Sequence, residues 1–336
     1  MTSSGTSAER ETPEQAAPVP GGNNDGSAPR KVALRVSTLI GISLAVGGAA
    51  FVIEKIAAGW SDYGNVITRA RWGWLIGGLA IAIGGMSAMG LVWRRIITTL
   101  GGHASRREVF AWYQLGNLGK YVPGGLWPLV GRSELAVRGG LDRGIAYNSV
   151  ALSMGATYLS GTVVSAVLLP FVVLDQGRAG VSLWVFGLIP VGLAALHPTV
   201  LSRVFRSAER VLGKGAPQVV PPWLTSVGLV LRHALPWLAI GVATWLVAIT
   251  FEPSAPLLPL TFAGILSWVI GFVIIFVPGG IGVREAAFTA IASVTISPEI
   301  AATIAIASRL VFIAADALGA AAALALSPRR LDPTSG

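Results

Sequence analysis

Val122-Pro123-Gly124-Gly125 and Val277-Pro278-Gly279-Gly280 are two copies of one tetrapeptide, separated by 155 residues. The same offset aligns four further pairs of residues: Tyr113 with Trp268, Gly116 with Gly271, Tyr121 with Phe276, and Leu126 with Ile281. Proline cannot continue a helix and glycine loosens the backbone, so each copy is expected to break a helix. The sequence therefore predicts two similar halves, each with one broken helix.

The stretches that flank the two copies are strongly apolar. The chain has 336 residues, of which 53% are hydrophobic and only 12% are charged, and its mean hydropathy is +0.68. Several apolar stretches exceed the roughly 18 residues that indicate a transmembrane helix. These runs are continuous rather than alternating, which excludes a transmembrane β-barrel. We expect an all-α polytopic membrane protein.

About six full transmembrane helices and two broken segments are expected. The approximate spans are 37–57, a second one that follows Trp74 and ends near residue 97, and then 147–173, 181–196, 235–251 and 299–326. The first broken segment is expected to enter the membrane over residues 110–121 and to return to the same side over residues 127–136. The second goes in over 259–277 and returns over 281–296. In this arrangement the two segments enter from opposite sides of the membrane, which predicts an inverted repeat of the kind found in transporters.

Composition also sets the expected domain boundaries. These are a disordered tail at 1–35, a membrane domain at 36–326 and a short tail at 327–336. Within the membrane domain, a first half (36–197) is joined to a second half (234–326) by a polar connector (198–233). Most of the 25 Lys and Arg residues fall on the side of the N-terminus. By the positive-inside rule, both tails and the connector are expected to be cytoplasmic, in a bacterial plasma membrane.

Seven charged residues are expected at membrane depth: Lys120, Arg132, Glu134, Arg284, Glu285, Arg309 and Asp316. A charge at the bilayer centre costs about 2.5–3.5 kcal/mol, so such side chains normally face the bundle interior or a wet cavity. The guanidinium fork suits phosphate, and a helix N-terminus after each Gly-Gly adds partial positive charge. One interpretation is therefore a site for an anionic headgroup. The other is that the charges only pair with one another and hold the broken helices together.

The candidate headgroup-binding residues combine these charges with the two motifs. They are Lys120, Tyr121, Pro123, Gly124, Gly125, Arg132, Glu134, Pro278, Gly279, Gly280, Arg284, Glu285, Arg309 and Asp316. Arg309 and Asp316 lie two helical turns apart, on one face of the last span. Lys120 directly precedes the first break and is the candidate for a mobile cation.

The composition gives little support to a metal site, a cofactor, a nucleic-acid partner or an enzymatic activity. Cysteine is absent and the three histidines are isolated, so no metal site and no cofactor are expected. The net charge of +9 comes from basic residues at helix ends, which argues against a nucleic-acid partner. No Ser-His-Asp arrangement is visible, and we do not expect an enzyme.

The residues Gly119 to Trp127 with Arg132, and Pro278 to Glu285, resemble the motifs of a known family, the lysylphosphatidylglycerol synthase transmembrane region. The resemblance covers about Val36 to Leu326. It implies a flippase-like module, which in bifunctional members moves an aminoacylated phospholipid between leaflets after a separate cytosolic domain has made it. The chain ends ten residues after the last span, so no such transferase domain is expected.

The expected function is binding and translocation of an anionic or zwitterionic lipid, with membrane lipids as partners. One alternative is a scaffold for lipid or cell-wall glycosyltransferases or other lipid-modifying enzymes, in which the surface of residues 199–222 would matter most. A further alternative is an embedded transferase that acts on polyprenyl phosphate.

Overall fold

The computed structural model describes residues 71–121, 127–175, 197, 199–200, 202–203, 221–273 and 280–326. All regular structure within these residues is helical. Four described helices are long and apolar enough to cross a membrane: α3 (Trp72–Thr99), α6 (Arg143–Asp175), α10 (Trp223–Phe251) and α13 (Pro298–Leu326). The expected all-α polytopic fold is thereby confirmed. The expected spans 37–57 and 181–196 and both tails lie outside the described residues.

Each expected broken segment contains a pair of short helices. The first consists of α4 (Arg106–Asn117), the short 3-10 helix η1 (Leu118–Tyr121) and α5 (Trp127–Arg138), and the second of α11 (Leu257–Val273) and α12 (Val283–Ala292). The motif residues 122–125 and 277–279 lie outside the described residues. The described helices on either side are η1, which ends at Tyr121, and α5, which begins at Trp127, in the first segment, and α11 and α12 in the second.

Capping interactions determine where two of these short helices begin. The Ser105 side chain accepts a hydrogen bond from the backbone N–H of Glu108 at 3.2 Å, and the Glu108 carboxylate accepts one from the N–H of Ser105 at 2.9 Å. This reciprocal pair satisfies two donors that a helix start leaves free. At the start of α12, Gly282 has a φ of 80°, and its N–H donates to Oε2 of Glu285 at 2.7 Å. Glycine adopts this left-handed conformation without strain.

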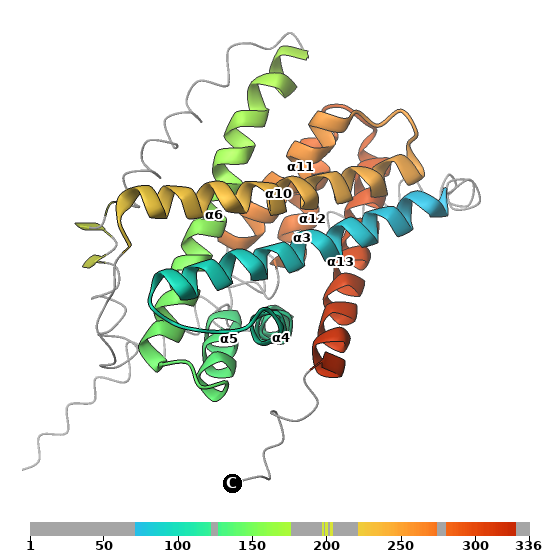
Figure 1. Ribbon diagram of the computed structural model, residues 1–336. Helices are drawn as coiled ribbons and strands as arrows, with labels where there is room; N and C mark the ends of the chain where they lie inside the picture. Colours follow the sequence, from blue (N-terminus) through green and yellow to red (C-terminus); the bar gives the residue numbers. More distant parts are fainter. Residues whose placement is uncertain are drawn as a thin grey trace, which may run out of the picture. The chain divides into compact units, whose positions relative to one another are not determined.

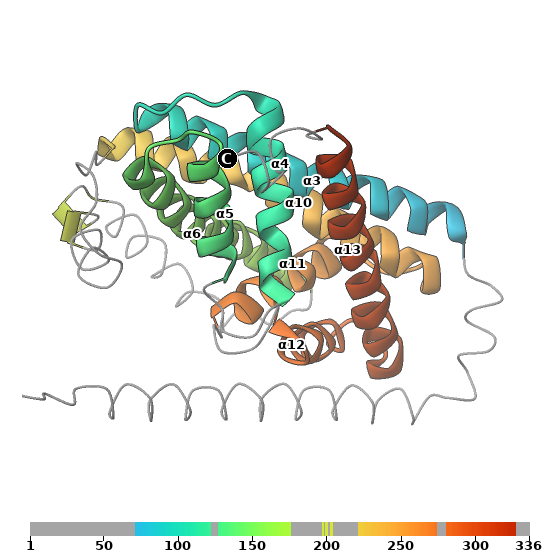
Figure 2. The same ribbon diagram turned by 90° about the horizontal axis from the view of Figure 1, so that it is seen from below.

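The two halves meet along α3 and α10, which run side by side in Figures 1 and 2. They are antiparallel, since the N–H of Arg71 before α3 donates to the carbonyl of Thr250 at the end of α10, at 3.4 Å. Small residues allow the close approach. A Cβ at Gly78 would lie 3.2 Å from the carbonyl oxygen of Ala243, and one at Gly85 would lie 3.0 Å from the Cβ of Ala239.

Other helices also pack against helices of the opposite half. Helix α4 of the first half packs against α13 of the second, and α11 of the second packs against α6 of the first. Where α4 meets α13, the side chain of Gln114 packs against Gly319. Where α11 meets α6, the side chain of Val269 packs against Gly161. Gln114 and Val269 are again separated by the repeat offset. Equivalent helices therefore have equivalent neighbours and α3 opposes α10 in direction, as an inverted repeat requires.

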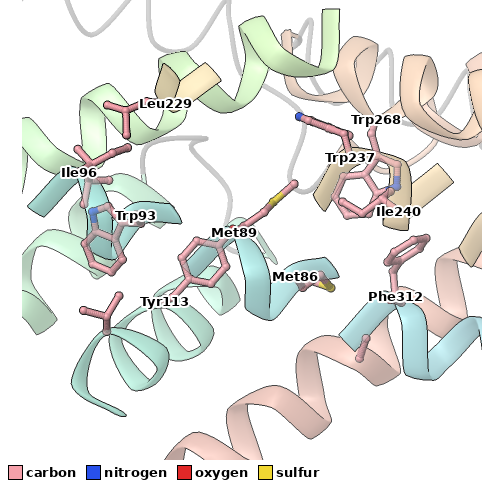
Figure 3. Close-up of a cluster of buried hydrophobic side chains, with 14 of the residues drawn as sticks. Met86, Met89, Trp93, Ile96, Tyr113, Leu229, Trp237, Ile240, Trp268 and Phe312 are labelled. Carbon is pink, nitrogen blue, oxygen red and sulfur yellow. The ribbon is translucent and has the colours of Figure 1, made fainter. Parts of the chain in front are cut away.

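The largest buried cluster joins helices of both halves. It includes Met86, Met89 and Trp93 of α3, Tyr113 of α4, Trp237 and Ile240 of α10, Trp268 of α11 and Phe312 of α13 (Figure 3). Within it, the rings of Trp268 and Phe312 meet edge to face with 5.0 Å between their centroids. The broken segments are thus anchored by large aromatic side chains, which fixes the helices that carry the charged residues.

Helix α10 begins at Trp223, whereas the sequence predicted a connector as far as residue 233 and a span from 235. Residues 223–233, which the expected connector includes, are therefore helical and continuous with a membrane-span candidate. Arg232 and His233 lie within this helix. Both side chains contact their own helix: Nη1 of Arg232 donates to the carbonyl of Gly228 at 3.1 Å, and Nδ1 of His233 lies 2.9 Å from that of Leu229.

A glycine substitution tests the contact between α3 and α10. We expect Gly85→Val to destabilise the protein by about 1–3 kcal/mol, because the added side chain overpacks the crossing. Gly84→Val is the matched control, since a Cβ at Gly84 meets no atom within 4 Å. Thermal unfolding in detergent measures the difference. Equal stability of the two variants would contradict the proposed close packing.

Candidate functional site

Two residues of the first half bind one carboxylate of the second half. Nζ of Lys120 lies 2.5 Å from Oδ2 of Asp316, and the side chains are 14% and 2% exposed. The hydroxyl of Tyr121 donates to the same oxygen at 2.6 Å. The second carboxylate oxygen, Oδ1, is buried and has no hydrogen-bond partner. This contact ties η1, directly before the first motif, to the middle of α13.

A second ion pair joins α12 to α13. Nη1 of Arg309 lies 3.3 Å from Oε1 of Glu285, and both side chains are nearly buried. The other carboxylate oxygen of Glu285 accepts the N–H of Gly282 at the start of α12. The negative charge of Glu285 therefore already lies at this helix N-terminus, where the sequence interpretation expected a headgroup. The helix end contributes less free positive potential than expected.

Glu134 is separate from these pairs. Its Oε1 accepts hydrogen bonds from Nη2 of Arg143 at 2.9 Å and from the hydroxyl of Tyr147 at 2.5 Å. Its side chain is 33% exposed, and that of Arg143 is 66% exposed. Glu134 thus joins α5 to α6 near the surface, and the structure does not bring it together with Arg132, which precedes it by two residues.

Arg284 makes no ion pair and no hydrogen bond with any residue that the structure describes. It is 6% exposed, and its guanidinium carbon lies 3.8 Å from the ring centroid of Trp268 and 4.9 Å from that of Phe312. It also lines a narrow crevice with Ser267 and Ser308. The adjacent carboxylates of Glu285 and Asp316 are bound by Arg309 and Lys120 instead. The ring faces hold the Arg284 charge without neutralising it.

Arg132 has a similar environment in the first half. Its guanidinium carbon lies 4.2 Å from the ring centroid of Tyr113, and its Nη2 donates to Oδ1 of Asn117. Its Nε is buried without a hydrogen-bond partner. No carboxylate pairs with it among the residues that the structure describes.

The sequence analysis did not identify the rings that hold these arginines. Tyr113 and Trp268 were noticed as a repeated pair but were not assigned to the site, and Phe312 was not singled out. The available signal was spacing: each ring precedes a repeated glycine by three residues, and Phe312 lies between Arg309 and Asp316 on one helix face. Rings at such positions are common in any apolar helix, so spacing alone carried little information.

The glycine-rich part of the predicted site is described only at its end. Pro123, Gly124, Gly125, Pro278 and Gly279 lie outside the described residues. Gly280 has a φ of 65° and lies against α11, where a Cβ on it would be 3.1 Å from the Cα of Gly271. Only glycine combines this conformation with this contact. Most of the connector 199–222 is also outside the described part. Among the described residues, no three His, Cys, Asp or Glu side chains form a group that could hold a metal.

The Lys120–Asp316 pair predicts a specific pattern of stability. We expect Asp316→Asn to destabilise the protein by about 3–5 kcal/mol, because it leaves a buried ammonium without a counter-charge. Adding Lys120→Met should restore most of the loss. Thermal unfolding of the single and double variants in detergent tests this expectation. Wild-type stability of the single variant would show that the pair does not exist.

The chain matches a known protein family over most of its length. A search of curated proteins gives no match. The family model described as the lysylphosphatidylglycerol synthase TM region matches residues 38–318, which include both broken segments and all of the charged residues described above. The family places the chain among membrane proteins that take part in lipid handling. The chain belongs to the lysylphosphatidylglycerol synthase transmembrane region family.

Proposed function

We propose that this protein binds the phosphate of an anionic or zwitterionic lipid at Arg284 and moves that lipid between the leaflets of the bacterial plasma membrane. One observation carries the proposal. Arg284 is a buried guanidinium without a carboxylate partner, although two carboxylates lie in the same cluster and bind other cations. An ionisable side chain in a membrane span normally has a partner or marks a substrate pathway.

The geometry around Arg284 favours a phosphate oxygen as its missing partner. Stacking on Trp268 uses the face of the guanidinium and leaves the N–H groups at its edge available. Those groups form the planar fork that binds phosphate in a bidentate manner. Lys120 and Arg309 are both close enough to Arg284 to interact electrostatically with it. Lys120 and Arg309 would add positive potential at the site if a bound headgroup weakened their ion pairs with Asp316 and Glu285.

The inverted repeat supports translocation rather than binding alone. Transporters with such repeats place the substrate at the interface of the halves, next to discontinuous helices, and alternate by moving one half against the other. Here Arg284 follows the second break, and its neighbours Lys120 and Asp316 come from different halves. We propose transport and not covalent catalysis as the activity. Membrane lipids are the proposed partners.

We further propose that both termini are cytoplasmic, so that the loops before α4 and α11 lie on opposite sides of the membrane. His103 and Ser254 are exposed residues in these loops, and the chain has no native cysteine. In intact cells, His103→Cys should react with an impermeant maleimide only after permeabilisation, whereas Ser254→Cys should react directly. Labelling of both from the same side would rule out the inverted arrangement.

Substitution of Arg284 tests the proposed headgroup site. We expect Arg284→Gln to stay folded but to retain at least tenfold less co-purified phospholipid, and Arg284→Lys to rescue poorly because a point charge cannot reproduce the fork. Arg284→Gln with Glu285→Gln should not recover lipid, because Glu285 pairs with Arg309. Lipid is measured by mass spectrometry of the purified protein.

A matched control for that experiment is Arg232→Gln, which removes an exposed arginine of α10 that donates to the carbonyl of Gly228 in its own helix. This variant should retain lipid as the wild type does. Movement of fluorescent phosphatidylglycerol in liposomes provides the second measurement. If the double neutral variant regained lipid, Arg284 would serve to balance Glu285, and the headgroup proposal would be wrong.

A further inference from the structure

Asp316 is a buried carboxylate of which only one oxygen has partners. Its Oδ2 contacts Nζ of Lys120 at 2.5 Å and accepts a hydrogen bond from the hydroxyl of Tyr121 at 2.6 Å. Its Oδ1 is buried and has no hydrogen-bond partner. An ionised carboxylate accepts hydrogen bonds on both oxygens, and a buried oxygen without a donor is costly. A proton bound at Oδ1 would remove the negative charge and that cost together.

The surroundings of Asp316 are rich in cations. Within the described residues, the titratable and charged groups of this cluster come from η1, α12 and α13, and they are Lys120, Tyr121, Arg284, Glu285 and Arg309. Helix α4, which also packs against α13, contributes the neutral side chain of Gln114 beside Gly319. A change of protonation at Asp316 is therefore felt by the arginine proposed to hold the lipid phosphate.

The contact between Lys120 and Asp316 joins the first half to the second. It must break when one half moves against the other, as the proposed transport requires. Separating a buried pair leaves uncompensated charges, which is costly. The cost is avoided if each partner receives a replacement, namely an anion for Lys120 and a proton for Asp316. A lipid phosphate at Arg284 can supply the anion, because Lys120 is close enough to Arg284 to interact electrostatically with it.

Glu285, the other buried carboxylate of this cluster, is bound differently. Both of its oxygens have partners, which are Nη1 of Arg309 and the N–H of Gly282. Arg309 and Glu285 also belong to the same half, so motion between the halves does not separate them. The geometry therefore selects Asp316 as the carboxylate that exchanges its partner for a proton.

We infer that Asp316 is a proton-binding site coupled to lipid binding. Its Oδ1 takes up one proton from solution as the lipid phosphate engages Arg284 and Lys120, and the proton and the lipid cross the membrane together. One O–H bond forms on Asp316 while its contact with Lys120 breaks, and no covalent bond of the lipid is cleaved. For a lipid with one negative charge, this step moves no net charge. The inference rests on the proposed function and adds the proton gradient as its energy source.

Proton uptake during lipid binding tests this inference. Purified protein in weakly buffered detergent solution is titrated with dioleoyl-phosphatidylglycerol, whose phosphodiester does not titrate near neutral pH, and a pH-sensitive dye records the protons bound. We expect about one proton per bound lipid, and an affinity that falls about tenfold for each unit rise in pH. Asp316→Asn combined with Lys120→Met should bind the lipid through Arg284 without proton uptake and without this pH dependence.

The matched control is Asp142→Asn, which neutralises an exposed aspartate before α6 and should keep the uptake of the wild type. In liposomes with a pH difference, the wild type and this control should enrich fluorescent phosphatidylglycerol in the leaflet on the alkaline side. The double variant should not do so, and a membrane potential alone should drive no enrichment.

Lipid binding by the wild type without proton uptake would overturn the proton site and leave the Arg284 site intact. Unchanged proton uptake by the double variant would do the same, because another group would then bind the proton. If Arg284→Gln bound phosphatidylglycerol with the affinity of the wild type, the proposed function itself would fail. The two failures are therefore distinguishable.

Discussion

Charge balance in a medium that solvates ions poorly is the constraint on which the interior of this protein depends. An isolated charge in a membrane span is costly, and breaking a buried pair costs about 3–5 kcal/mol. Lys120 meets Asp316 and Arg309 meets Glu285 under this constraint. The same constraint makes an unmatched arginine informative. Arg284 has ring faces around it that reduce the cost of its charge without cancelling it.

Glycine makes this arrangement possible, because an arginine reaches the ring of the preceding helix only where that helix has no side chain in the way. Gly116 and Gly271 provide this close approach in the two halves. The packing of the paired helices is required as well, since α5 lies against α4 and α12 lies against α11. The repeated glycine admits the guanidinium between the two helices of each pair.

The two halves are not equivalent in their charges, although their helices are equivalent in packing. The repeat offset places Ile275 and Phe276 at the positions of Lys120 and Tyr121. These residues cannot form an ion pair, so the second break has no counterpart of the contact with Asp316. The two halves therefore differ in the polar contact that stands next to the motif, although their helices pack alike.

The sequence by itself determined the membrane class and the helical fold, and it singled out charged residues of which Arg284, Glu285 and Asp316 are buried in the structure. Each of these follows from local composition or from periodic spacing, which the chain carries whatever its tertiary contacts. Only the tertiary structure decided which charges pair. Glu134 and Arg132 are two residues apart but face different neighbours, whereas Lys120 and Asp316 are far apart in sequence and meet directly. Helix α10 begins at Trp223, before the expected start of the span at residue 235, and Arg232 donates to the carbonyl of Gly228 in its own helix. Which charges pair depends on how the two halves pack, and no local sequence pattern specifies this packing. The unmatched charge of Arg284 follows from it.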